Sequence, residues 1–153
     1  MHRYNEVMLE ESAEARDLGI DISILNYDFE DKPILIGGKA LEYYGVRSSD
    51  NDYSFVITED DYYRLSYKYS DNLKDLYDDL GVCVFDFEVW KSIYMLDYEF
   101  FLEGAIEEED FYVVSFEKIM FMKVLSINSD KSKRDLALMR NRMAVINTIR
   151  LDG

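Results

Sequence analysis

The sequence contains very little cysteine, histidine or proline. Among 153 residues there is one of each: Cys83, His2 and Pro33. A single cysteine excludes an internal disulfide and is typical of proteins of a reducing cytoplasm. A single histidine at the start of the chain argues against chemistry that needs histidine as a base or a metal ligand. The only proline marks no domain boundary, and the sequence contains no low-complexity linker. We therefore expect a single domain over 1–153.

Long apolar runs are also missing. No stretch reaches the ~20 uncharged apolar residues that span a bilayer, and residues 1–17 are charged throughout, without the apolar region of a signal peptide. Apolar residues make up 48% of the chain and charged residues 32%, which is typical of a soluble globular protein with one real core. The expected location is cytoplasmic, with no membrane partner.

Basic residues are scarce, and they are unevenly placed. The chain has 17 basic and 32 acidic residues, a net charge of −15, so non-specific DNA binding is not expected. The segment from Lys118 to Arg150, however, has eight basic and two acidic residues, a net +6 that leaves −21 for the remainder. This segment is either a solvated helix face or a surface that meets a phosphate.

The hydrophobic pattern predicts an α/β (α+β) fold, a small mixed β-sheet flanked by helices, with a core over about 33–115 and a C-terminal helical part over about 115–150. The expected strands are 33–36, 52–57 and 82–90, and residues 93–114 form a helix or a pair of strands. The expected helices are 4–17, 39–44, a long one from the cap Thr58 to Leu80 that ends at Gly81, 115–127 after the cap Ser115, and a last one from about 132 with an apolar stripe at Leu136, Met139, Met143, Ile146 and Ile149.

Gly37 and Gly38 lie between the apolar strand 33–36 and the helix that follows. Glycines at such a turn let the backbone pass close to a ligand, and the free N–H groups of the next helix suit a triphosphate. A tight turn in a packed sheet is the alternative.

Asp50 and Asp52 are two residues apart where the predicted strand 52–57 begins, so their carboxylates share one face with Ser54 and Val56. Two neighbouring anions are favourable where a cation or water lies between them, and Mg²⁺ takes one or two carboxylates together with substrate phosphates. Ordinary surface acids are the alternative. The opposite face, with Tyr53, Phe55 and Ile57, is apolar, so we expect the strand to hold the two acids in a fixed position.

Asp86 is the expected third acid, because it interrupts the aromatic run from Val84 to Phe87. A carboxylate on a neighbouring strand completes a three-acid metal cluster. Glu88 shares its face and is the second choice, and a solvated edge strand is the alternative to both.

The glycine pair, an eleven-residue gap and then Asp50-Asn51-Asp52 resemble the signature of the DNA polymerase beta-like nucleotidyltransferase superfamily. The sequence Gly-Gly-Lys-Ala-Leu…Tyr-Gly-Val-Arg…Asp-Asn-Asp is similar to that of the small bacterial and phage branch of this superfamily. That branch includes abortive-infection and toxin-type enzymes of toxin–antitoxin and phage-defence systems. The later residues Ser115, Glu117, Lys123, Lys131 and Asp135 resemble that branch more loosely. The likeness covers about residues 33–140.

The resemblance implies a minimal nucleotidyltransferase fold that moves NMP from an NTP to a hydroxyl of a protein or RNA acceptor. It implies that Asp50, Asp52 and Asp86, with Glu88 as the fallback, bind Mg²⁺ or Mn²⁺ and carry the catalysis. The implied nucleotide-binding residues are Gly37, Gly38, Lys39, Lys123, Lys131 and Asp135.

The sequence departs from this family at Ser132, where an acid is expected, and it leaves little room for an acceptor-binding domain. A non-catalytic acidic binding or regulatory module on the same fold is therefore the alternative function. The C-terminal charge adds one geometric expectation. A triphosphate beside three carboxylates needs positive neighbours, so Lys123 and Lys131 should border the acidic site.

Overall fold

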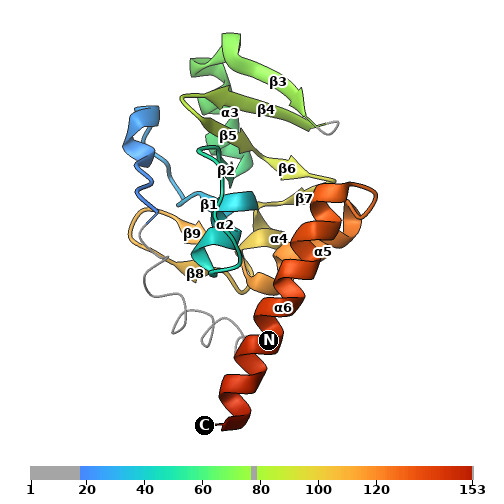
Figure 1. Cartoon of the computed structure of the whole chain (residues 1–153). Coiled ribbons are helices and arrows are strands. Elements are labelled where there is room, and N and C mark those ends of the chain that lie inside the picture. Colours follow the sequence, from blue (N-terminus) through green and yellow to red (C-terminus); the bar gives the residue numbers. More distant parts are fainter. Residues whose placement is uncertain (1–17, 77–78, 153) are drawn as a thin grey trace.

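The structure is a computed structural model that describes residues 18–76 and 79–152. The predicted helix over 4–17 and His2 lie outside the described residues. The fold is mixed α/β, with one seven-stranded mixed sheet, a small two-stranded sheet and flanking helices (Figure 1). The fold class expected from the sequence is therefore confirmed.

Helices and strands alternate in the first part of the chain, five strands follow in succession, and two helices end it. The strands are β1 (Ile34–Ile36), β2 (Tyr53–Val56), β3 (Leu73–Leu76), β4 (Asp79–Val84), β5 (Phe87–Trp90), β6 (Ser92–Ile93), β7 (Leu96–Asp97), β8 (Ile106–Glu107) and β9 (Tyr112–Val113). The helices are η2 (Ile22–Leu25), α2 (Gly37–Tyr43), α3 (Glu59–Lys68), η3 (Ser70–Asn72), α4 (Tyr98–Leu102), α5 (Phe116–Leu125) and α6 (Asp130–Asp152).

The order of strands in the large sheet is β3-β4-β5-β2-β1-β9-β8. β1 runs antiparallel to β2 and parallel to β9, and β2 runs parallel to β5. The carboxyl ends of β1 and β9 therefore lie at the same edge of the sheet as the amino ends of β2 and β5. Residues that follow β1 and residues that precede β2 are brought together at that edge.

The core lies around β1 and β2, which carry apolar side chains on both faces apart from Ser54. Ile34, Leu35, Phe55 and Val56 are all buried, as expected of central strands that are covered on both sides. The fully buried Tyr44, directly after α2, donates its hydroxyl to the carbonyl of Val114 at 2.8 Å. This bond fixes the end of α2 against the segment that leads into α5.

The predicted strand over 82–90 is wrong, because the chain reverses within it. β4 and β5 form an antiparallel hairpin whose turn residues, Phe85 and Asp86, have positive φ angles of 51° and 69°. Two-residue hairpin turns need left-handed backbone at both positions and usually contain Asn or Gly. Phe85-Asp86 lacks that signature. The alternation of apolar and polar residues therefore predicted one strand where the structure has two.

The predicted helix from Thr58 to Leu80 is also too long. Thr58 does cap it, since its side chain accepts from the N–H of Asp61, but α3 ends at Lys68 and β3 follows. Gly81, predicted as the helix stop, lies within β4 beneath the ring of Trp90. A Cβ at Gly81 would lie 2.8 Å from the Trp90 Nε1 atom. The glycine therefore makes room for a ring on the next strand.

The two C-terminal helices lie on one side of the molecule, and α6 extends well past the sheet (Figure 1). Ser115 caps α5 as predicted, by accepting from the N–H of Lys118. In the apolar stripe of α6, Met139 and Ile146 are buried and Leu136 and Met143 are half-buried. No helix among residues 18–76 and 79–152 is long and apolar enough to cross a membrane.

Candidate functional site

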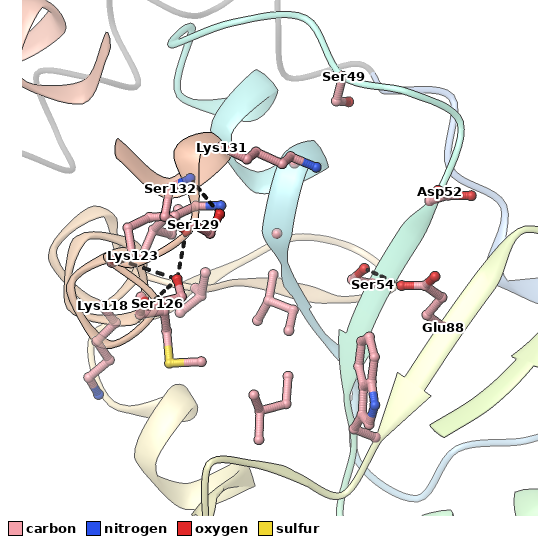
Figure 2. Close-up of a pocket in the computed structure, with 18 of the residues that line it drawn as sticks. Ser49, Asp52, Ser54, Glu88, Lys118, Lys123, Ser126, Ser129, Lys131 and Ser132 are labelled. Carbon is pink, nitrogen blue, oxygen red and sulfur yellow. Dashed lines mark hydrogen bonds between the residues drawn. The ribbon is translucent and has the colours of Figure 1, made fainter. Parts of the chain in front are cut away.

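A pocket of about 360 Å³ opens at the sheet edge where β1 ends and β2 and β5 begin. The residues at its polar end are Gly37, Gly38, Arg47, Ser49, Asp50, Asp52, Ser54, Glu88, Lys123, Ser126, Ser129, Lys131 and Ser132. Figure 2 shows Ser129, Lys131 and Ser132 on one side and Asp52, Ser54 and Glu88 on the other. The pocket thus has a basic, serine-rich wall from α5 and α6 and an acidic wall from β2, β5 and the loop before β2.

The glycine turn packs tightly against the acidic wall. Gly37 has a φ of 71°, which strains any other residue, and a Cβ there would lie 3.4 Å from Cβ of Ser54. A Cβ at Gly38 would lie 3.2 Å from Cβ of Ser49. Gly37 therefore lets the backbone approach β2, and Gly38 lets it approach the loop before β2. α2 has only seven residues, so its dipole adds less at this turn than the sequence led us to expect.

The acidic wall begins with Asp50 and Asp52, which both line the pocket and are both exposed. They lie before β2, which starts at Tyr53, rather than on the strand as predicted. Ser54, the first inward-facing residue of β2, lies beside Glu88 of β5 in the parallel ladder and donates its hydroxyl to the Glu88 carboxylate at 3.4 Å.

Glu88, the fallback in the sequence analysis, lines the pocket, whereas Asp86 is not among the lining residues. The reason is the hairpin turn: Asp86 occupies an exposed turn position with positive φ. Burial raises the pKa of Glu88, and the charge of Asp52 raises it further, against the opposing effects of Ser54 and Lys131. Glu88 and Asp52 are therefore close enough to repel each other.

The predicted cluster of three converging acids is not found. Within the described ranges, no group of three or more His, Cys, Asp or Glu side chains has the arrangement of a metal site. The acidic wall offers Asp50 and Asp52, which lie two residues apart before β2, and Glu88, whose pKa is raised by Asp52. These hard oxygen donors fit a Mg²⁺ ion that takes one or two carboxylates and completes its shell with water and phosphate.

The basic wall contains Lys131 in the first turn of α6, exposed and turned toward the opposite wall (Figure 2). A lysine at a helix N-terminus opposes the helix dipole, by about 0.3–1 kcal/mol. Serine residues lie on the same wall. The Oγ atoms of Ser126 and Ser132 are 2.7 Å apart, and Ser129 Oγ accepts from the N–H of Ser132 at 3.1 Å. The structure thus places Lys131 and several hydroxyl groups beside the acidic wall.

Behind this wall lies the buried carboxylate of Asp135, which joins two cations. Its Oδ1 and Oδ2 atoms accept from Arg47 Nε at 2.7 Å and Nη2 at 3.1 Å, and Lys123 Nζ lies 2.9 Å from Oδ2. Burial alone would raise the pKa of Asp135, but the bonds from Arg47 and Lys123 outweigh it and hold that pKa below its usual range. Asp135 does not line the pocket; it positions the two cations that do.

Lys39, predicted to contact nucleotide, is not among the residues that line the pocket. It is buried, pairs with Glu42 at 3.2 Å, and its Nζ lies 5.5 Å from the centre of the Tyr53 ring. Glu42 in turn accepts from the backbone N–H of Ser49 at 3.3 Å. Lys39 therefore helps to fix the loop before β2 from behind.

Sequence reasoning missed Arg47, the pocket serines and Trp90. The partner of Arg47 is 88 residues away, so no local spacing reveals it. Trp90 carries a buried Nε1 atom without a hydrogen-bond partner, and it contributes to the apolar end of the pocket. That end also includes Ile36, Ile93, Tyr94, Phe101, Val114, Ile119 and Met122.

Comparisons with protein-family models, with curated proteins and with solved structures found no match to this chain.

Proposed function

We propose that this protein is a divalent-metal-dependent nucleotidyltransferase that moves NMP from an NTP to a hydroxyl group of a protein or RNA acceptor. The observation that supports the proposal best is the two-walled pocket. A glycine turn with positive φ, an acidic wall and a basic wall meet at one edge of the sheet. A metal–triphosphate complex has the matching distribution of charge, with a cation at one end and phosphate oxygens at the other.

Each wall has a distinct task in this proposal. Lys131 and Lys123, with the hydroxyls of Ser126 and Ser129, bind phosphate oxygens. Asp50 and Asp52 hold the cation, since exposed carboxylates lose little hydration when they exchange water for Mg²⁺. The bound metal would offset the charge that develops on the phosphate as pyrophosphate leaves.

Glu88 has the properties of a general base. It is half-buried, and its pKa is raised, which brings that pKa closer to working pH and improves its ability to accept a proton. In the proposed step, a Glu88 carboxylate oxygen takes the proton of the acceptor hydroxyl. The hydroxyl oxygen forms a bond to the α-phosphorus as the bond to the pyrophosphate oxygen breaks.

Calorimetry tests the proposal directly. We expect NTP with Mg²⁺ or Mn²⁺ to release binding heat with the wild type, and we expect Asp52→Ala to abolish it. Asp110→Ala removes an equally exposed acid outside the pocket and is the matched control. No heat at about millimolar nucleotide, or the same heat from wild type and Asp52→Ala, would contradict the proposal.

The second candidate is a non-catalytic acidic module that binds a basic surface. The absence of a three-acid cluster in the described part of the chain favours it, as does the net −21 outside residues 118–150. Such a module needs its acids spread over a face. Binding of a basic partner that is insensitive to Asp52→Ala, together with silent NTP calorimetry, would favour this candidate.

A further inference from the structure

The open face of the β3–β4–β5 part of the sheet continues directly from the pocket. Partners in the strand ladders place Glu88 beside Cys83, and Gly81 beside Lys74. Side chains of ladder partners share a face, so Lys74, Cys83 and Glu88 lie on the face that includes Trp90. Lys74 is exposed and Cys83 and Glu88 are half-buried. The pocket, which Glu88 and Trp90 line, therefore borders this sheet face.

Residues 69–99, which include β3, β4 and β5, form an acidic lobe. Its net charge is opposite in sign to that of the basic wall across the pocket. Residues 69–99 contain eight acids and two lysines, a net −6, whereas residues 118–150 carry +6. Of these acids, Asp79 and Asp86 lie at the two ends of the open face, and Glu88 and Lys74 lie between them. Exposed Asp86 sits at the turn next to Asp52, and Asp79, half-buried at the start of β4, accepts from the N–H of Tyr94 at 3.0 Å. Tyr94 itself lines the pocket.

We propose that this open face, flanked by Asp79 and Asp86, binds the acceptor and that the acceptor is a lysine- or arginine-containing polypeptide segment which presents a hydroxyl side chain. The inference rests on the proposed function and adds the class of acceptor. The basic wall serves the phosphates, so the acidic lobe is left to the other reactant. A phosphodiester chain laid on this lobe would meet a net negative field, whereas a cationic segment would be attracted to it.

Direct binding tests the inference without any transfer. The probes are a short synthetic peptide with one serine flanked by lysines, its counterpart with glutamates, and a single-stranded oligoadenylate of equal length. We expect the lysine peptide to bind most tightly by fluorescence anisotropy, with an affinity that falls as salt rises. Tighter binding of the oligoadenylate, or equal binding of the two peptides, would overturn the inference.

Paired variants locate the surface. Asp79→Asn with Asp86→Asn removes two charges and keeps both side-chain shapes, and we expect it to weaken the lysine peptide about two- to tenfold. Glu109→Gln with Asp110→Asn removes two exposed charges between β8 and β9, at the opposite edge of the sheet, and is the matched control. Equal affinities of the two double variants would refute the assignment.

Cys83, the only cysteine, supplies an independent footprint. Burial raises the pKa of its thiol, so alkylation by N-ethylmaleimide is measured at mildly alkaline pH. Saturating lysine peptide should slow the reaction severalfold, and an unchanged rate would place the peptide elsewhere. If the peptide binds and protects Cys83 but gains no NMP from any NTP, the proposed function fails while the assignment of this surface to cationic segments stands.

Discussion

The two walls of the pocket are built on opposite principles. In the basic wall, Asp135 is buried and its charge is matched by Arg47 and Lys123 before any ligand arrives. In the acidic wall, Asp50 and Asp52 are exposed, and Glu88 has only a weak bond from Ser54 and a repulsive neighbour. The basic wall therefore contributes to the stability of the fold. The acidic wall carries negative charge without matching cations, which the proposed Mg²⁺ would offset.

Removal of the Asp135 carboxylate should have the largest effect on stability. Asp135→Ala leaves Arg47 and Lys123 as neighbouring cations without their shared partner, and we expect a loss of about 3 kcal/mol in the free energy of unfolding, measured with urea. Asp135→Asn is the control that keeps the shape of the side chain. A loss below about 1 kcal/mol would show that water replaces the carboxylate at little cost.

The stability that the Asp135 carboxylate contributes to the fold also depends on pH. Because the pKa of Asp135 is lowered in the folded protein, its stabilising contribution is present above the ordinary value of about 3.9 and is lost as pH falls toward the folded value. The stability difference between wild type and Asp135→Asn should therefore shrink in acid. A difference that stays constant below about pH 4 would contradict the assigned cause.

The two lysines of the basic wall separate stability from binding. Lys123→Glu places a carboxylate beside Asp135, so we expect it to lower the melting temperature and to weaken NTP binding. Lys131→Glu should weaken NTP binding by about tenfold with little change in melting temperature, because Lys131 is exposed. The ion pair between Lys123 and Asp135 is the reason for this difference. Calorimetry and thermal unfolding of the two variants form the test, and equal melting temperatures would refute this distinction.

The smallest expected effect on stability concerns Glu88 and has the opposite sign. Its raised folded-state pKa means that ionisation costs stability as pH rises through that pKa. Glu88→Gln should therefore be more stable than wild type at neutral pH and equally stable below the ordinary glutamate value of about 4.3. It should also abolish transfer of NMP. A variant that is less stable than wild type at neutral pH would show that the carboxylate is not under strain.

Local signals in the sequence predicted the parts of the fold that local physics determines. The apolar run at 33–36, the cap at Thr58 and the cap at Ser115 each act within a few residues, and each is found in the structure. The hairpin at Phe85-Asp86 was missed because its backbone conformation is imposed by strand pairing rather than by favourable turn residues.

The site follows the same division. Gly37, Gly38, Asp50 and Asp52 were found from spacing along the chain, and they do line one pocket. Asp86 was preferred to Glu88, but Glu88 lines the pocket and Asp86 does not. The difference depends on the position of the hairpin turn. Lys39 was predicted to bind nucleotide but does not line the pocket, and Arg47 was not predicted at all. Their partners, Tyr53 for one and Asp135 for the other, are set by packing across the fold.

Trp90 lies over Gly81, beside Glu88 and along the pocket lining, and it is the only tryptophan in the chain. The indole emission of the unlabelled protein therefore originates from a single place, at the junction between the pocket and the open sheet face. Occupancy of either one changes the surroundings of the same fluorophore. Titrations with NTP and with the lysine peptide, the ligands proposed above, can thus each be followed optically on the native chain.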